Sequence, residues 1–141
     1  MLGSMLAPIA DRVYALVRIV SGGMFAFHGM QKVFGVLSKM SFSQLDSQGK
    51  AGGIIELVTG LMIAIGFFGR TAAFLASGTM AVAYWQFHVV NSKVEGISRF
   101  LPGTNGGEPA VLYCFLFLFM ACKGSGPMSV DAMREKKAKS E

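Results

Sequence analysis

Charged residues are scarce in this chain. They make up 15% of its 141 residues, whereas a soluble domain averages about 25%. Cysteine is rare too: Cys114 and Cys122 are the two in the chain, in one apolar stretch. Their spacing corresponds to about 12 Å along a helix, which is beyond the reach of a disulfide. No Cys-x-x-Cys pair occurs. These absences argue against an ordinary soluble domain and leave the chain without a dithiol redox centre.

Apolar residues take the place of the missing charges, at 52% of the chain. They form four long stretches, which predict helices at about 14–36, 51–68, 71–90 and 106–122. Each stretch approaches the ~20 residues that cross ~30 Å of hydrocarbon. A buried helix of a soluble core would explain one such stretch but not four in succession. The sequence therefore predicts an all-α, polytopic membrane protein. Its single domain, residues 1–141, would be an antiparallel four-helix transmembrane bundle with a polar tail at 123–141.

Basic residues indicate the orientation of these helices. The net charge is +5, and more Lys and Arg flank the ends of the stretches that share a side with the termini. The positive-inside rule then places both termini in the cytoplasm. The N-terminus does not resemble a cleaved signal peptide, because Asp11, Arg12 and Arg18 interrupt its apolar residues. The basic residues form no aromatic-interleaved patch, so nucleic acid is not an expected partner.

Ionisable side chains interrupt the apolar stretches at alternating ends. In helices that run up and down, all of these positions meet on one side of the bilayer, here the outer side. A charge near the centre of a membrane helix costs about 2.5–3.5 kcal/mol, so several at one level predict a polar pocket. Arg18 is a separate candidate for a polar residue on the cytoplasmic side. The candidate pocket residues are His28, Lys32, Glu56, Tyr84, His88, Asn105 and Glu108.

The chemistry of these residues suits a small lipophilic ligand. Lys32 can pair with Glu56 or Glu108, and histidines can carry protons near neutral pH. An aromatic, apolar cavity with a few polar groups fits a quinone, whose reduction also needs protons. Simpler roles stay open: histidines can hydrogen-bond neighbouring helices, Lys32 can extend to the interface, and Glu108 can stabilise a helix N-terminus. No His-x-x-x-His or Glu-x-x-His spacing occurs, so no metal site is predicted.

At these residues the sequence resembles the DoxX family of small bacterial membrane proteins, over about residues 14–132. The similarity is carried by motifs in a fixed order. They are Phe27-His28-Gly29-Met30-Gln31-Lys32-Val33-Phe34-Gly35, Gly52-Gly53-Ile54-Ile55-Glu56-Leu57, Gly66-Phe67-Phe68-Gly69-Arg70-Thr71-Ala72-Ala73, Asn105-Gly106-Gly107-Glu108 and Gly124-Ser125-Gly126-Pro127-Met128-Ser129-Val130-Asp131-Ala132.

The resemblance implies a multi-pass protein of the bacterial inner membrane. Family members include the membrane subunit of a thiosulfate:quinone oxidoreductase, so the resemblance implies a quinone-interacting or redox-complex subunit that is not catalytic alone. It would use a quinone without a covalently bound cofactor and would need a soluble or membrane redox partner; a homo-oligomer is a further expectation. The alternative is a non-enzymatic small-molecule or ion carrier, or a membrane assembly factor. Arg18 favours the carrier, because it shares a helix face with Lys32 and could extend a polar path across the bilayer.

Overall fold

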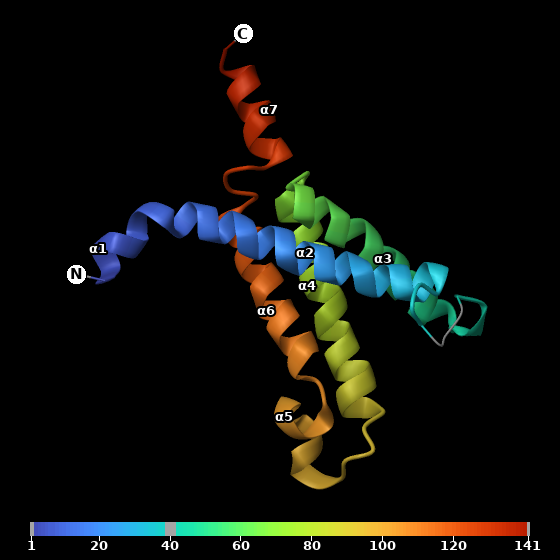
Figure 1. The fold of residues 1–141 in the computed structure, drawn as a ribbon. Helices are drawn as coiled ribbons and strands as arrows, with labels where there is room; N and C mark the ends of the chain where they lie inside the picture. Colours follow the sequence, from blue (N-terminus) through green and yellow to red (C-terminus); the bar gives the residue numbers. More distant parts are fainter. Residues whose placement is uncertain (1, 39–41, 141) are drawn as a thin grey trace.

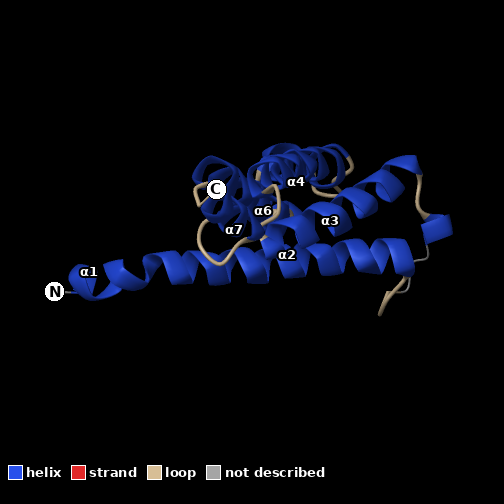
Figure 2. Cartoon of the chain, turned by 90° about the horizontal axis from the view of Figure 1, so that it is seen from above, coloured by secondary structure: helices blue, strands red, loops and turns tan. Residues whose placement is uncertain are grey.

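The computed structural model describes residues 2–38 and 42–140, and helices dominate both ranges, with no strand in either (Figures 1 and 2). The predicted all-α class is therefore confirmed. In order the elements are α1 (Leu2–Leu6), the 3₁₀ helix η1 (Ala7–Ile9), α2 (Ala10–Phe34), the 3₁₀ helix η2 (Phe42–Gln44), α3 (Ser47–Ile65), α4 (Gly69–Ala83), the π-helix η3 (Tyr84–Val90), the 3₁₀ helix η4 (Gly96–Phe100), α5 (Pro102–Asn105), α6 (Glu108–Lys123) and α7 (Val130–Ala138).

Two antiparallel hairpins form the body of the molecule. The first pairs α2 with α3 and the second pairs α4 with α6. The hairpins lie across each other, with α2 running from side to side and α4 and α6 running from top to bottom in Figure 1. Seen from above, the second hairpin and α7 lie on one side of α2 (Figure 2). The termini lie at the left and top of Figure 1, and the two loops that close the hairpins lie at the right and bottom.

Local signals in the sequence fix the ends of the first hairpin. Gly35 and Gly66 follow α2 and α3 in the left-handed conformation, with φ of 67° and 69°, which glycine adopts without steric strain. Asp46 caps the start of α3 by accepting a hydrogen bond from the Gly49 amide at 2.7 Å. Because of this cap, α3 begins at Ser47 instead of at position 51, where the apolar stretch starts.

Small residues allow α2 and α3 to pack backbone against backbone. A Cβ added to Gly22 would lie 2.6 Å from the Ala64 nitrogen, and one added to Gly60 would lie 2.4 Å from the Ala26 nitrogen. A Cβ on Gly29 would lie 2.3 Å from the Leu57 nitrogen. Such distances leave no room for a side chain. Contacts this close are typical of membrane helices that associate through small residues.

Aromatic side chains join the two hairpins. The ring of Phe25 in α2 lies 4.9 Å from that of Phe117 and 5.6 Å from that of Tyr113, both in α6. Phe25 and Phe117 are fully buried, beside Ile63 of α3 and Met80 of α4. Stacked and edge-on rings contribute about 0.5–1.5 kcal/mol beyond their buried area. This cluster sets where the second hairpin rests on the first.

Two helices of the described chain are long and apolar enough to cross a membrane, Gly3–Phe34 and Ser47–Ile65. Large apolar side chains are exposed along both hairpins, including Leu16, Val20, Leu61 and Phe115, as expected for surfaces that face lipid. Two segments differ from a simple helix-and-tail pattern. The stretch predicted at 71–90 is α4 followed by the π-helix η3, and the polar tail contains α7.

Candidate functional site

A cavity of about 420 Å³ lies between the two hairpins at the end where the loops close them. We refer to it as the inter-hairpin cavity. Its walls come from the end of α2, the start of α3, the end of α4 with η3, and the start of α6. Most of the wall is apolar, and four of the ionisable residues predicted from the sequence lie in it. The lining residues are Phe25, His28, Lys32, Leu45, Asp46, Gln48, Gly49, Gly52, Glu56, Thr79, Met80, Val82, Ala83, Phe87, His88, Pro109, Ala110 and Tyr113.

An ion pair between Lys32 and Glu56 is the principal polar feature of this cavity. Lys32 Nζ lies 2.6 Å from Glu56 Oε1, and the side chains are 36% and 4% exposed, respectively. Gly53 makes room for the lysine stem, because a Cβ there would lie 2.8 Å from Lys32 Cβ. Pairing offsets the cost of burying the carboxylate. The second oxygen, Glu56 Oε2, is buried and has no hydrogen-bond partner among the described residues.

His88 lies on the opposite wall, in the π-helix η3. Its Nδ1 lies 3.2 Å from the carbonyl oxygen of Asn105. A carbonyl oxygen only accepts, so Nδ1 carries the hydrogen, and in the neutral ring Nε2 is an acceptor. His28 also lines the cavity, from α2, with an exposed side chain. Single-turn π-helical segments are frequent at functional sites, and here one carries a candidate site residue.

Tyr84 and Asn105, both predicted to lie in the pocket, instead hold the second loop in place. Tyr84 stacks on His88 at 6.3 Å between ring centroids and donates through its hydroxyl to the Phe100 carbonyl at 2.9 Å. Asn105 donates to the Arg99 carbonyl at 2.8 Å and accepts from the Gly107 amide at 2.8 Å. Neither residue lines the inter-hairpin cavity. Their contacts position His88 through its ring face and its Nδ1.

Glu108 lies away from this cavity. It is exposed at the start of α6 and borders a separate apolar groove formed by α2 and α6. The sequence could not separate Glu108 from Glu56 as the partner of Lys32, and in the structure Lys32 pairs with Glu56.

Arg18 is buried at the other end of the first hairpin, and its side chain binds backbone. Nη1 donates to the carbonyls of Ile63 and Ala64 at 2.9 and 2.8 Å, and Nη2 donates to the carbonyl of Met128 at 2.8 Å. The first two carbonyls belong to the last turn of α3, where helical carbonyls lack intrahelical partners. Arg18 therefore caps α3 and joins it to the segment that precedes α7.

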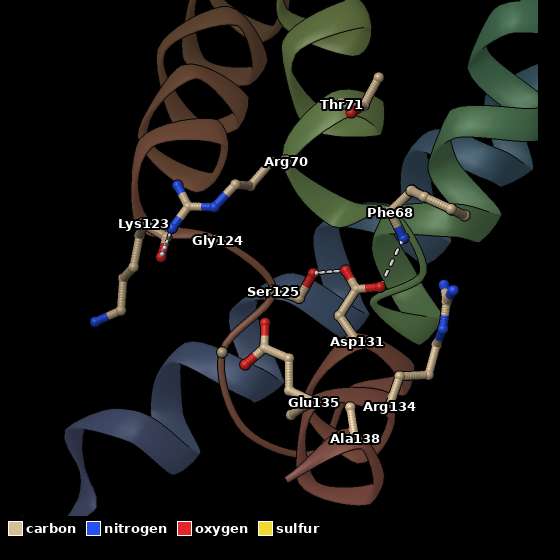
Figure 3. A pocket seen from close by; sticks show the side chains of 12 residues that line it. Phe68, Arg70, Thr71, Lys123, Gly124, Ser125, Asp131, Arg134, Glu135 and Ala138 are labelled. Atoms are coloured by element: carbon tan, nitrogen blue, oxygen red, sulfur yellow. Dashed lines mark hydrogen bonds between the residues drawn. The ribbon is translucent and has the colours of Figure 1, made fainter.

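A second polar cluster surrounds Arg18 at the α3–α4 turn, and Figure 3 shows part of it beside a cavity of about 800 Å³. Asp131 accepts hydrogen bonds from the amides of Phe68 and Gly69 at 3.0 and 2.9 Å and from the Ser125 hydroxyl at 2.5 Å. Arg70 donates to the carbonyls at the end of α6. We refer to Arg18, Arg70, Ser125, Ser129 and Asp131 as the turn cluster.

The pKa of Asp131 reflects these contacts. Burial favours the neutral acid, but the hydrogen bonds from Ser125, Gly69 and Phe68 and the nearby charge of Arg134 outweigh it, so the pKa of Asp131 is lowered. Sequence reasoning missed this residue, since it treated the segment as a polar tail. Capping signals mark the helix: Ser129 precedes it and accepts from the Ala132 amide at 3.1 Å, and basic residues end it.

Comparison with known proteins assigns the chain to a family. A family model described as DoxX matches residues 13–89. An uncharacterized protein of Haemophilus influenzae is 36% identical over 124 residues, which cover 83% of this chain and 87% of that protein. No solved structure matches the chain. The motifs around the Lys32–Glu56 pair fall inside the matched residues, and the chain therefore belongs to the DoxX family of membrane proteins.

Proposed function

We propose that this protein is a multi-pass subunit of the bacterial inner membrane that binds a quinone in the inter-hairpin cavity and acts within a redox complex. The observation that carries this proposal is a buried carboxylate, Glu56, held by Lys32 in the wall of a mostly apolar cavity. Lone buried ion pairs in membrane helices are expensive and are typical of ligand or proton sites.

The dimensions and lining of the cavity support a quinone. A volume of about 420 Å³ falls in the range of small-molecule sites, about 300–1,000 Å³. Phe25, Met80, Phe87 and Tyr113 provide apolar walls for a ring and its side chain. Lys32 would donate to a ligand oxygen, while His88 and Glu56 would exchange protons with it. The quinone supplies the electron chemistry when bound, and the other redox centre would belong to a partner protein.

The proposed orientation has both termini in the cytoplasm and the cavity near the outer face. All four long helices of the two hairpins would then cross the membrane. In support, Arg18, Arg70, Lys123 and Arg134 lie at the end opposite the cavity. An excess of Lys and Arg marks the cytoplasmic side of membrane proteins.

A quinone titration tests the proposal. A short-chain ubiquinone would be added to the protein in nanodiscs while fluorescence of Trp85, the one tryptophan, is followed. Trp85 lies in η3, one turn before His88. We expect saturable quenching by the wild-type protein and binding about tenfold weaker after Lys32→Met or His88→Ala, as for loss of one hydrogen bond.

Controls separate specific binding from partitioning into lipid. Glu95→Gln alters an exposed loop residue at the same end of the molecule and should leave the titration unchanged. Glu108→Gln is a second informative variant: a loss of binding there would favour the pocket predicted from sequence over the inter-hairpin cavity. Non-saturable quenching that is equal in all variants would refute quinone binding at this site.

The carrier alternative loses its main support. It depended on Arg18 extending a polar path from Lys32 across the bilayer. Arg18 is only 2% exposed, and both of its terminal nitrogens donate to backbone carbonyls. Solute flux into liposomes that is abolished by Lys32→Met would restore that alternative, and loss of a partner complex without loss of quinone binding would favour an assembly factor.

A further inference from the structure

The Lys32–Glu56 pair and His88 bring hydrogen-bond acceptors to the inter-hairpin cavity for which no donor is recorded among the described residues. Glu56 Oε2 is an acceptor without a partner. His88 contributes a second acceptor, because its Nδ1 hydrogen is directed to the Asn105 carbonyl and its neutral Nε2 has only a lone pair. Lys32 is a donor, and one of its hydrogens already binds Glu56 Oε1. A ligand that only accepts hydrogen bonds would leave these acceptors unsatisfied.

We infer that this cavity selects a hydroxyl-bearing ring, the quinol form of the proposed ligand, over the carbonyl or ether form, with its hydroxyl donating to Glu56. This inference rests on the proposed function and names the form of ligand that the same site prefers. A hydroxyl oxygen can accept from Lys32 while its hydrogen is donated to Glu56. A carbonyl or ether oxygen can only accept from Lys32, and it leaves a buried carboxylate oxygen without a donor.

The carboxylate can meet such a ligand without leaving Lys32. Oε2 is buried in the structure. However, the torsion that orients the two oxygens of a glutamate is broad, so the group can turn while Lys32 stays in contact. A quinol also has a second hydroxyl across its ring. His88, which also lines the cavity, offers Nε2 as an acceptor for it.

A pair of redox-silent ligands tests this preference directly. 4-Butylphenol and its methyl ether, 4-butylanisole, share the ring and the butyl chain, and the ether carries a methyl group in place of the hydroxyl hydrogen, so it cannot donate a hydrogen bond. Their binding would be measured with the protein in nanodiscs, after subtraction of their partition into protein-free nanodiscs. We expect the wild-type protein to bind the phenol at least about tenfold more tightly, because the ether leaves a buried acceptor unsatisfied.

Glu56→Gln should reduce or reverse the preference for the phenol over the ether. If the amide oxygen stays with Lys32, the amide nitrogen faces the ligand and donates a hydrogen bond. The affinity for the ether should then rise relative to the affinity for the phenol. Glu95→Gln, the same change at an exposed site, should keep the wild-type ratio. If Glu56→Gln fails to fold, the ratio of phenol affinity to ether affinity in the wild-type protein and in Glu95→Gln still tests the preference for a hydroxyl-bearing ligand.

The outcomes separate this inference from the proposed function. Equal binding of phenol and ether by the wild-type protein, or tighter binding of the ether, overturns the preference while quinone binding stands. Failure of the wild-type protein to bind the phenol, the ether and the short-chain quinone overturns both.

Discussion

The two polar clusters of this protein make opposite use of buried charge. In the turn cluster, Arg18 and Asp131 direct their charged groups at backbone amides and carbonyls, and within the described residues Nε of Arg18 is the buried polar side-chain atom of this cluster without a hydrogen-bond partner. In the inter-hairpin cavity, Glu56 binds one side chain, Lys32, and its second oxygen is buried without a hydrogen-bond partner among the described residues. A charged group that backbone groups satisfy indicates a structural role, whereas a buried carboxylate oxygen that no donor satisfies, on a residue that lines an apolar cavity, indicates a ligand site.

Replacement of Arg18 by Met should have the largest effect on stability. It leaves the carbonyls of Ile63, Ala64 and Met128 without their donor, and hydrogen bonds from charged groups contribute about 1.5–3 kcal/mol each. We expect the free energy of unfolding to fall by at least about 3 kcal/mol. Thermal melting in detergent would measure it. Arg12→Ala, at an exposed position, should change it by less than about 0.5 kcal/mol.

Two glycine substitutions should disturb the two clusters separately. In Gly66→Ala, at φ of 69°, the new Cβ meets Ser129 and Arg18; in Gly29→Ala it meets the backbone of Leu57, next to Glu56. Each should lose about 1–3 kcal/mol of stability, as for overpacking. Quinone affinity of the folded fraction should drop only in Gly29→Ala, because there α3 shifts against α2. Equal affinity losses would show that the clusters are coupled.

A double-mutant cycle on Lys32 and Glu56 should show that the pair is retained for its ligand. Lys32→Met leaves Glu56 as an unpaired buried carboxylate, and we expect a loss of about 2 kcal/mol, below the range for fully buried pairs because Lys32 is 36% exposed. Adding Glu56→Gln should recover most of that loss, since no charge is then stranded. The double variant would then regain stability but would not bind quinone. A double variant as unstable as Lys32→Met alone would assign the pair a structural role.

Asp131→Asn should have the smallest effect, and one that depends on pH. The ionised side chain is stabilised in the folded protein, so its pKa is lowered. Its contribution is then fully present above the unfolded value of about 3.9 and is lost as the pH falls through the folded pKa. At pH 7 we expect the variant to be about 1 kcal/mol less stable, as for loss of a helix cap. The difference between the two melting curves should shrink below pH ~4; a constant difference would contradict this account.

Periodicity and composition were sufficient to predict the helices but not their mutual rotation. Hydropathy places α2 and α3 within four residues of their observed bounds, and the third stretch matches α4 and η3 taken together. It cannot show which face of α6 is inward, because nearly every residue of that helix is apolar. In the structure Ala110 and Phe117 are buried, and Glu108, two residues before Ala110, is therefore turned to the opposite face of the helix.

Other features of the structure have no signal in hydropathy or in the placement of polar residues. The π-helix η3 has no distinctive residue pattern, and its contact with the second loop, between His88 and Asn105, joins residues that are distant in the sequence. Tyr84 and Asn105 were predicted as pocket residues because polarity alone does not distinguish a side chain that binds ligand from one that binds its own loop. The quinone, the redox partner, the oligomeric state and the inner-membrane location stay predictions.

The glycine contact between α2 and α3 has a mechanical consequence. No side chains lie between the backbones at Gly22, Gly29 and Gly60. Because the two backbones are in direct contact, a shift of one helix against the other would meet steric resistance, and we expect the first hairpin to move as a rigid unit. Lys32 and Glu56 lie on these two helices, so we expect their spacing to be kept when the hairpins move relative to each other. The adjustable wall of the cavity is then the second hairpin, and adaptation to ligands of different width falls to η3 and the first turns of α6.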